Sequence, residues 1–280
     1  MALDGIDGRV ALVTGAARRR GIGRATALRL AEEGADVACL DIARPYADAP
    51  GHGTGSADEL VEVVAQIEAM GRRALAVTAD VSDGAAVEDA VAAATEALGT
   101  ITLVANVAGG SGPGFGMGPM LVVPEAEFRR VLDVNLLGTW LVAKACATRM
   151  VGAGVGGRIV NVSSQAGKRA FPMLGAYCAA KAGVILVTQA MATELGPQGI
   201  TVNAVCPGTV DTDLINPNGM FKVMVDAGGG GFDRWVAENI PLNRLQTAED
   251  VAGAIAVLMS DDGSYITGEA VNISGGQTMV

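Results

Sequence analysis

The sequence has few of the side chains that build metal sites and histidine-based triads. It contains one histidine, His52, and four cysteines, which are scattered through apolar segments without metal-like spacing. Such a set offers little to an N/S metal site, so we expect no bound metal and reduced, mostly buried thiols. A Ser-His-Asp mechanism would have to use His52, and we expect this residue to lie in a solvated loop because its neighbours are mainly Gly, Pro and Ala.

Positive charge and long apolar runs are also scarce. The chain carries 20 basic and 30 acidic residues, a formal net charge of -10. A field of this sign repels phosphate backbones and anionic membrane surfaces, so neither nucleic acid nor a membrane is an expected partner. No apolar run reaches the roughly 18 to 20 residues of a membrane span, and the start of the chain lacks a basic segment followed by a long apolar core. The sequence therefore predicts a soluble, cytoplasmic protein.

What the chain does contain is a repeated alternation of short runs rich in Val, Ile and Leu with segments of helical spacing. This alternation indicates βαβ units, and continuous apolar runs are typical of parallel strands covered on both faces. Seven strands are predicted, over residues 9–14, 36–41, 73–78, 101–106, 158–163, 200–205 and 269–274. The predicted fold is α/β: one doubly wound, Rossmann-type parallel sheet of about seven strands with helices on both faces. Residues 1–280 are expected to form a single domain with its ligand crevice at the carboxyl ends of the strands.

Two segments depart from this rhythm. Residues 45–56 read as a flexible insertion after the second strand. Residues 210–246 form a long excursion that we expect to cover the crevice as a lid, because Trp235, Ile240 and Leu242 give it side chains to bury. The alternative is a disordered surface loop.

Glycines cluster between the first predicted strand and the first predicted helix. Gly15, Gly21 and Gly23 stand where the backbone can approach a pyrophosphate and a helix N-terminus can receive its charge. Asp41 ends the second predicted strand 18 residues after Gly23 (41 minus 23). An acidic residue near this spacing meets the adenosine ribose hydroxyls and repels a 2′-phosphate, which favours NAD over NADP. Several arginines could instead pair with such a phosphate: Arg18, Arg19, Arg20 and Arg44.

The chemistry is expected in the segment that holds Ser164, Tyr177 and Lys181. Tyr177 and Lys181 are four residues apart in a predicted helix over 176–195, so both leave the same face. An ammonium beside a phenol favours the phenolate and lowers the pKa of the tyrosine. Ser164 follows a predicted strand and could hold a substrate oxygen, with Ser163 as the alternative. Taken alone, Tyr177 and Lys181 could also be two exposed side chains of a surface helix with no role in catalysis.

Together these features resemble the short-chain dehydrogenase/reductase family of the classical type. The resemblance covers nearly the whole chain and rests on residues whose order and spacing are more specific than any single motif: the glycine turn, Asp80, Asn106 to Gly109, Asn135, Ser164, Tyr177 with Lys181, and Pro207-Gly208. Two departures are a glycine turn with five residues rather than three between its first two glycines, and Val107 where the family often has asparagine. Members of the family are commonly homotetramers.

The resemblance implies a role for each matched position. Tyr177 would be the general acid/base, Lys181 would lower its pKa and bind the nicotinamide ribose, Ser164 would hold the reacting oxygen and Asn135 a relay water. Asp80 could also simply cap the helix that follows it. The expected cofactor contacts are Gly15, Arg20, Gly21, Ile22, Gly23, Asp41, Asp80, Val81, Asn106, Ala108, Gly109, Tyr177, Lys181, Pro207, Gly208, Val210 and Thr212.

The predicted function is an NAD-dependent oxidoreductase that interconverts a secondary alcohol and a ketone. The alternatives are an NADP-dependent ketoreductase and a catalytically silent nicotinamide-binding regulatory protein. The substrate is expected to be a neutral, partly apolar small molecule, selected by residues 110–121 and 210–246, unless Lys168 and Arg169 contact an anion. Four apolar side chains could line its pocket or fill core gaps: Met117, Met120, Phe171 and Met173.

Overall fold

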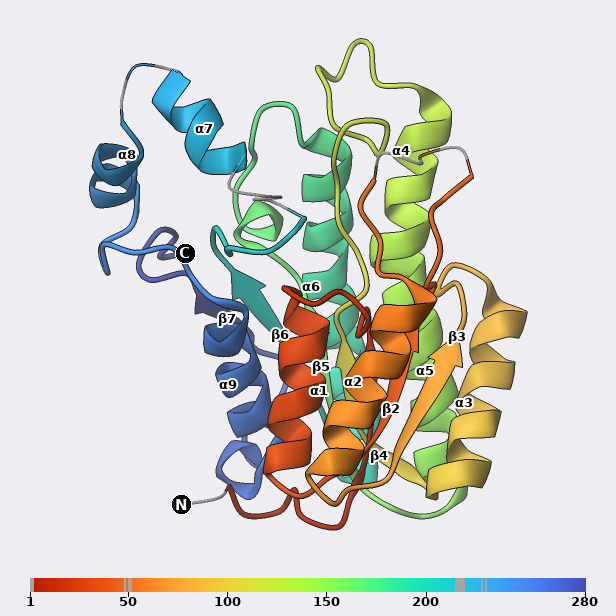
Figure 1. Ribbon diagram of the computed structural model, residues 1–280. Coiled ribbons are helices and arrows are strands. Elements are labelled where there is room, and N and C mark those ends of the chain that lie inside the picture. The colour runs from red at the N-terminus through yellow and green to blue at the C-terminus, as the bar shows by residue number, and fades with distance from the viewer. Residues whose placement is uncertain (1–2, 48, 50–51, 215–219, 228, 230) are drawn as a thin grey trace.

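A parallel sheet of seven strands lies at the centre of the protein (Figure 1). The structure, a computed structural model, describes residues 3–47, 49, 52–214, 220–227, 229 and 231–280. The strands are β1 Val10–Thr14, β2 Asp36–Asp41, β3 Ala74–Thr78, β4 Ile101–Asn106, β5 Gly157–Val162, β6 Ile200–Pro207 and β7 Ala270–Ile273. They are arranged in the order β3-β2-β1-β4-β5-β6-β7. The prediction of a doubly wound sheet is confirmed, and the order reverses between β1 and β4, where such sheets bind their ligands.

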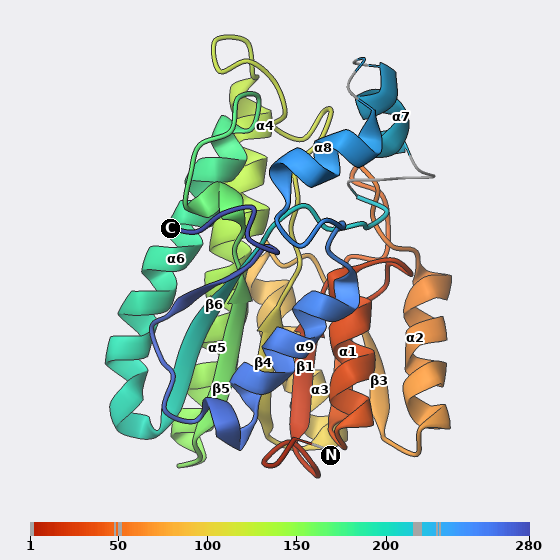
Figure 2. The same ribbon diagram turned by 90° about the vertical axis from the view of Figure 1, so that its left-hand side faces the viewer.

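Helices cover both faces of the sheet, as the view in Figure 2 shows. Along β1, Val10 and Leu12 belong to the core under α3, α5 and α6, whereas Ala11 and Val13 belong to the core under α1, α2 and α9. Burial on both sides explains why the strands read as continuous apolar runs. The helices are α1 Ile22–Glu32, α2 Ala57–Ala69, α3 Gly84–Leu98, α4 Glu125–Leu132, α5 Gly138–Gly152, α6 Gly175–Leu195, α7 Met220–Ala227, α8 Phe232–Asn239 and α9 Ala248–Met259.

Side-chain caps define where several helices begin. Ser56 and Glu59 form a capping box at the start of α2, and Thr247 and Asp250 form another at the start of α9. Asp83 accepts hydrogen bonds from the first backbone N–H groups of α3. These caps satisfy amide donors that have no partner within the helix, and they fix the points at which the chain leaves the loops above the strands.

The long helix that the sequence predicts over 125–150 is interrupted. A π-helical turn, Asp133–Leu137, separates α4 from α5. The Nδ2 group of Asn135 donates to the carbonyl oxygen of Val131 one turn earlier and to that of Gly110, 2.9 Å away in both cases. The turn therefore holds Asn135 toward the loop after β4, and turns of this type are frequent at functional sites.

Two helical segments have the length and mean hydropathy of a membrane span: Glu125–Gly152 and Gly175–Gln198. About half of each is buried inside the protein, 56% and 44% of the most apolar stretch. Both pack over the sheet and carry buried polar side chains, Asn135 and Lys181. Helices that cover the core of a globular domain have these properties, so the segments do not indicate a membrane span.

The described part of the insertion after β2 packs around an aromatic cluster. Residues 48, 50 and 51 lie outside the described residues. His52 stacks on Phe115 with ring centroids 4.0 Å apart, and Tyr46 packs against both rings. The prediction that His52 lies in a solvated loop is wrong, because the side chain is only 6% exposed. Burial, with a smaller contribution from Arg18, lowers the pKa of His52 to about 4. A neutral imidazole can pack in this way at neutral pH without a counter-charge.

The excursion predicted over 210–246 contains α7 and α8, which lie beyond the carboxyl ends of the strands (Figure 2). Residues 215–219, 228 and 230 of this segment lie outside the described residues. Val236 and Ile240 are buried, but Leu242 is 66% exposed, so the expectation that Leu242 is buried is wrong. Leu242 follows Pro241 at the point where the chain leaves α8 toward α9, and its backbone N–H donates to Gly275.

Candidate active site

Ser164 and Tyr177 meet where β5 ends and α6 begins. The hydroxyl of Ser164 lies within hydrogen-bonding reach of the Tyr177 hydroxyl and also accepts a hydrogen bond from the backbone N–H of Ala166. Ser163 takes a different position, because its hydroxyl is buried and donates to the Lys181 carbonyl oxygen at 2.7 Å. Of the two serines that the sequence offers, Ser164 is thus the one beside Tyr177.

Lys181 lies one turn further along α6 and is 3% exposed. Its Nζ is 5.6 Å from the centroid of the Tyr177 ring and donates to the Val162 carbonyl oxygen at 2.8 Å. Among the described residues no carboxylate forms an ion pair with it. A Cβ at Gly109 would lie 3.3 Å from this Nζ, so the absence of a side chain there keeps the space above the ammonium open.

Burial dominates the electrostatics of the pair. It raises the pKa of Tyr177 to about 12, against the opposing hydrogen bond from Ser164. It also lowers the pKa of Lys181 to about 8. Desolvation thus dominates the pKa of both groups, and the expected lowering of the Tyr177 pKa by Lys181 stays a prediction.

The Asn135 side chain is fully used by the backbone around it. Its Oδ1 accepts from the N–H of Gly110 at 2.9 Å, while Nδ2 donates to the carbonyl oxygens of Gly110 and Val131. The amide therefore braces the Gly109-Gly110 turn beside Lys181, and both of its N–H groups are used. The main-chain carbonyl oxygen of Asn135 accepts a hydrogen bond from the Thr139 hydroxyl at 2.9 Å.

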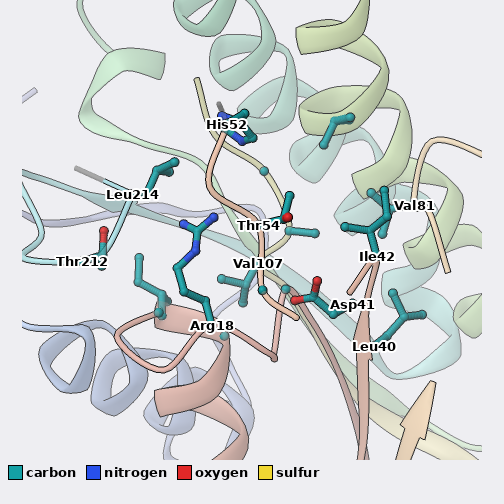
Figure 3. A pocket seen from close by; sticks show the side chains of 18 of the residues that line it. Arg18, Leu40, Asp41, Ile42, His52, Thr54, Val81, Val107, Thr212 and Leu214 are labelled. Carbon is teal, nitrogen blue, oxygen red and sulfur yellow. The ribbon is translucent and has the colours of Figure 1, made fainter. Parts of the chain in front are cut away.

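A cavity of about 130 Å³ lies at the carboxyl ends of β1 and β2 (Figure 3). Gly15 has φ of 69°, and a Cβ on Gly23 would overlap the carbonyl oxygen of Gly15, so the turn requires glycine at both positions. Asp41 closes the far end, where its two oxygens accept the backbone N–H groups of Ala17 and Ala43 at 3.0 Å each. A glycine turn, a helix N-terminus and a carboxylate at the end of β2 fit a dinucleotide.

The arginines of the enlarged glycine turn have separate partners. Arg19 pairs with Glu62, and Arg20 pairs with Asp211 at 2.7 Å and Asp213 at 3.4 Å. Arg18 alone extends into the cavity, as Figure 3 shows. Burial lowers the pKa of Arg18, and the carboxylates around it oppose this shift without forming an ion pair with it. Arg44 is exposed at the surface of the insertion.

Most of the expected cofactor contacts line either the glycine-rich cavity or an adjoining cavity beside Tyr177. Those that do are Gly15, Gly21, Ile22, Gly23, Asp41, Val81, Ala108, Gly109, Tyr177, Lys181, Pro207, Gly208, Val210 and Thr212. Arg20, Asp80 and Asn106 do not line either cavity. Asp80 accepts from the N–H and hydroxyl of Ser82, and buried Asn106 donates to Asn161 and Thr139. These two residues thus shape the turns beside the cavity, while Arg20 ties the glycine turn to the loop after β6.

The insertion supplies cavity walls that the sequence did not reveal. Tyr46, His52 and Thr54 line the glycine-rich cavity opposite Arg18. Nothing in the composition of residues 45–56 signals this contact, because it depends on Phe115 in a loop about sixty residues away. The structure therefore places the insertion over the cavity rather than in solvent.

The cavity beside Tyr177 is larger, about 370 Å³. Its walls are largely apolar and include Phe171, Leu174, Leu214 and Trp235. It adjoins the glycine-rich cavity, since Ile22, Val107, Gly109 and Leu214 line both. Its polar lining includes two amides that the sequence did not indicate, Gln165 and Gln277.

Several residues considered for substrate binding lie elsewhere. Met117, Met120 and Met173 are 42%, 57% and 43% exposed and do not line the cavity. Lys168 donates to the carbonyl oxygens of Ala270 and Val280, and Arg169 lies over the ring of Phe171. Of residues 110–121, only Gly110 lines the cavity. The expected anion contacts are thus absent among the described residues of the lining.

A doubly wound sheet with a glycine-lined cavity next to a Ser-Tyr-Lys cluster defines a Rossmann-type oxidoreductase. Comparisons with known proteins agree with this class. A family model described as enoyl-(acyl carrier protein) reductase matches residues 15–278. A short-chain dehydrogenase/reductase of Armillaria gallica is 38% identical over 96% of this chain and 95% of its own length.

Two relatives have more specific names. (-)-trans-Carveol dehydrogenase of Rhodococcus erythropolis and galactitol 2-dehydrogenase of Agrobacterium fabrum are each 34% identical, over 98% of this chain and 99% of their own lengths. The crystal structure of carveol dehydrogenase from Mycobacterium avium in complex with NAD superposes with a TM-score of 0.87, at 32% identity and with 97% of this chain and 98% of that chain covered. The chain belongs to the short-chain dehydrogenase/reductase family.

Proposed function

We propose that this protein is an NAD-dependent oxidoreductase that interconverts a secondary alcohol and a ketone. The observation that carries the proposal is the cluster of Ser164, Tyr177 and Lys181 in the largely apolar cavity that adjoins the glycine-lined one. Relatives named carveol, galactitol and sorbitol dehydrogenases support the same reaction class. A small neutral alcohol in the apolar cavity would face a nicotinamide held beyond the ends of β1 and β4.

Tyr177 is the acid/base of the proposed reaction. For oxidation its hydroxyl first releases its proton to water, and the phenolate then accepts the proton of the substrate alcohol while Ser164 holds the substrate oxygen. Bound NAD would supply the hydride acceptor. In the reverse direction the phenol protonates the forming alkoxide, and burial, which raises the pKa of Tyr177 to about 12, keeps that proton on the phenol until then.

Lys181 and Asn135 contribute to this step without exchanging a proton with the substrate. Lys181 would contact the ribose of the cofactor, since its Nζ lies under the open space at Gly109. The hydrogen bond from its ammonium group to the Val162 carbonyl oxygen leaves further N–H donors for that contact. Asn135 is a positioning residue, because its side chain reaches only backbone groups of Gly110 and Val131.

The preference for NAD rests on Asp41. Its carboxylate is 7% exposed and stands at the end of β2, where it would meet the adenosine ribose hydroxyls and repel a 2′-phosphate. Among the described residues, the other charged side chain in the lining of this cavity is Arg18, which belongs to the enlarged glycine turn itself. We assign Arg18 to the diphosphate, where a charge-assisted hydrogen bond adds to the backbone donors of the turn.

We also propose that the protein acts as a cytoplasmic homotetramer, with residues 1–280 as one dinucleotide-binding domain and residues 210–246 as its substrate lid. Exposed apolar side chains on the two long helices support association: Leu137, Trp140 and Leu186 are 38%, 38% and 67% exposed. Light scattering on the purified protein tests the assembly, and a monomer at micromolar concentration would contradict it.

A panel of secondary alcohols and ketones, followed by NADH absorbance with NADP in parallel, tests the proposal. We expect turnover of at least one neutral alcohol with NAD and much slower turnover with NADP. Faster turnover with NADP would support the ketoreductase alternative and contradict the role of Asp41. Tight NADH binding without turnover of any member would instead support a silent nicotinamide-binding protein.

A further inference from the structure

The end of the chain contributes to the substrate cavity. After β7 the backbone turns at Gly275 and Gly276, which have φ of 62° and 87°, and directs the Gln277 side chain into the cavity lining. The tail is held in place by Ser274, whose hydroxyl bonds to both the N–H and the carbonyl oxygen of Thr278. Lys168 holds the last residue through its carbonyl oxygen at 2.7 Å. Gln277 is thus a fixed part of the cavity wall.

Gln277 and Gln165 form a connected pair of amides. Gln277 Oε1 accepts from the N–H of Thr209 at 2.9 Å and from Nε2 of Gln165 at 3.3 Å. Gln277 Nε2 donates to the hydroxyl of Thr209 at 3.1 Å. Gln165 Oε1 accepts from the hydroxyl of Thr278 at 2.8 Å. These bonds fix the orientation of both amides.

Each of the two amides has one N–H group available to a ligand. Each amide nitrogen carries two N–H groups, and each uses one of them within the network. One N–H of Gln165 and one of Gln277 therefore have no partner among the described residues. Gln277 Oε1 already accepts two hydrogen bonds and Gln165 Oε1 accepts one, so this part of the lining presents mainly donors to a ligand.

The rest of the cavity restricts what those donors can meet. No carboxylate lines it in the part of the chain that the structure describes, and Lys181 is its one cationic side chain there. Phe171, Leu174 and Trp235 present apolar surface. A neutral ligand with an apolar body and an acceptor oxygen away from the reacting carbon satisfies both the walls and the free donors.

We propose that Gln165 and Gln277 form a second polar subsite that binds another oxygen of the substrate. The substrate class is then a neutral secondary alcohol that carries a further acceptor oxygen, such as an ether, hydroxyl or carbonyl group, on an otherwise apolar skeleton. This inference rests on the proposed function and deepens it. Gln165 follows Ser164 directly in the chain, so the subsite is tied to the residue that would hold the reacting oxygen.

A matched pair of ligands isolates this contact. 2-Methoxycyclohexanol and 2-ethylcyclohexanol have nearly the same shape and differ by an oxygen in place of a methylene group. Without the ether oxygen the amide N–H groups stay unpaired when the ligand excludes water. We expect the wild-type protein to prefer the methoxy alcohol in kcat/KM by about tenfold.

Gln277→Met keeps the length of the side chain and removes the donor. This variant should reduce the methoxy preference to about twofold or less, and Gln165→Met should do the same if Gln277→Met proves unstable. The matched control is Gln198→Met, which changes an exposed glutamine before β6 at the opposite end of the strands and should retain the full preference. NAD affinity, measured by calorimetry, checks that each variant is folded.

Binding provides a readout that does not depend on turnover. Calorimetry with the NAD complex and the corresponding ketones, 2-methoxycyclohexanone and 2-ethylcyclohexanone, should show the same preference and the same loss in Gln277→Met. Equal binding of the two ketones by the wild-type protein, or an undiminished preference in both glutamine variants, would overturn the subsite. If the proposed function fails, neither alcohol yields NADH although the ketone preference is still present.

Discussion

The two cavities of this protein are built in different ways. The glycine-rich cavity is bordered by backbone at the ends of β1, β2 and β4, with Arg18 and Asp41 as its charged side chains. The cavity beside Tyr177 is bordered mainly by side chains from segments far apart in the sequence, such as Phe171, Trp235 and Gln277. The first follows from the parallel sheet itself, whereas the second depends on how loops and the chain end pack over it.

The difference separates what the sheet dictates from what the loops decide. A glycine turn after the first strand and a carboxylate at the end of the second are typical of doubly wound sheets that bind NAD. The apolar cavity can be refitted by changing a few side chains without disturbing the sheet. We therefore expect substitutions in the glycine-rich cavity to alter cofactor binding, and substitutions in the apolar cavity to alter substrate choice.

The largest expected effect is at Tyr177, in the lining of the apolar cavity. Tyr177→Phe removes the proton acceptor and should lower kcat about 1,000-fold or more, since general acid/base catalysis contributes about 10²- to 10⁴-fold. NADH affinity, measured by fluorescence titration, should change less than twofold. Tyr265→Phe, at a fully exposed tyrosine, is the matched control and should behave as wild type. Undiminished turnover in Tyr177→Phe would remove the basis for its assigned role.

Arg18 tests whether the enlarged glycine turn is part of the cofactor site. Arg18→Met should weaken NADH binding about 10- to 100-fold, because it removes a charge-assisted contact to the diphosphate. The matched control is Arg19→Met, which breaks only an exposed ion pair with Glu62 and should change affinity less than twofold. Equal affinities for the two variants would show that Arg18 does not contact the cofactor.

Asp41 tests the preference for NAD over NADP at the adenosine end of the glycine-rich cavity. Asp41→Asn removes the negative charge with little change in shape and should raise the ratio of NADP to NAD turnover, in kcat/KM, by about tenfold. Asp36→Asn, at the other end of β2, serves as the control, because Asp36 pairs with Arg73 outside both cavities. A shift of the same size in the control would point to a general effect of charge.

The smallest expected effect concerns the insertion that covers the glycine-rich cavity. Burial lowers the pKa of His52 to about 4, below its ordinary value of 6.5, so between these values the unfolded chain binds more protons than the folded one. The contribution of neutral His52 to the free energy of unfolding is therefore fully present above pH 6.5 and is lost as the pH falls toward 4. From about pH 7.5 to about pH 5.5 the histidine should account for a loss on the order of 1 kcal/mol in the free energy of unfolding.

The measurement is urea unfolding at a series of pH values for wild type and His52→Phe. The phenylalanine keeps an aromatic ring against Phe115 but cannot be protonated. The two stability curves should diverge as the pH is lowered, with the variant less sensitive to acid. Parallel curves would mean that His52 has the same pKa in the folded and the unfolded protein, as a solvated side chain would.

The sheet could be predicted from the sequence because each strand is buried on both faces. Alternate residues of β1, such as Leu12 and Val13, enter different cores, which leaves an uninterrupted apolar run. The glycine turn and Asp41 could be located because their positions are set by the strand ends. The grouping of Ser164, Tyr177 and Lys181 was accessible for a similar reason, since one strand end and one helix face bring them together.

Other features depend on contacts between distant segments and leave no local pattern. The π-helical turn at Asp133–Leu137 needs the bond from Asn135 to Gly110, and the burial of His52 needs Phe115. Gln277 lines the substrate cavity only because two glycines turn the end of the chain back toward Thr209. Composition near these residues suggests loops, and their partners become visible only in three dimensions.

The central claim is that hydride passes directly from a secondary alcohol to NAD at Tyr177. The most direct measurement uses an alcohol of the 2-methoxycyclohexanol type with deuterium on the carbinol carbon, followed by mass spectrometry of the NADH formed. The account predicts that the NADH carries the deuterium with the wild-type protein and that labelled NADH forms about 1,000-fold more slowly, or slower still, with Tyr177→Phe. NADH formed without deuterium, or labelled NADH formed at the wild-type rate by the variant, would contradict it.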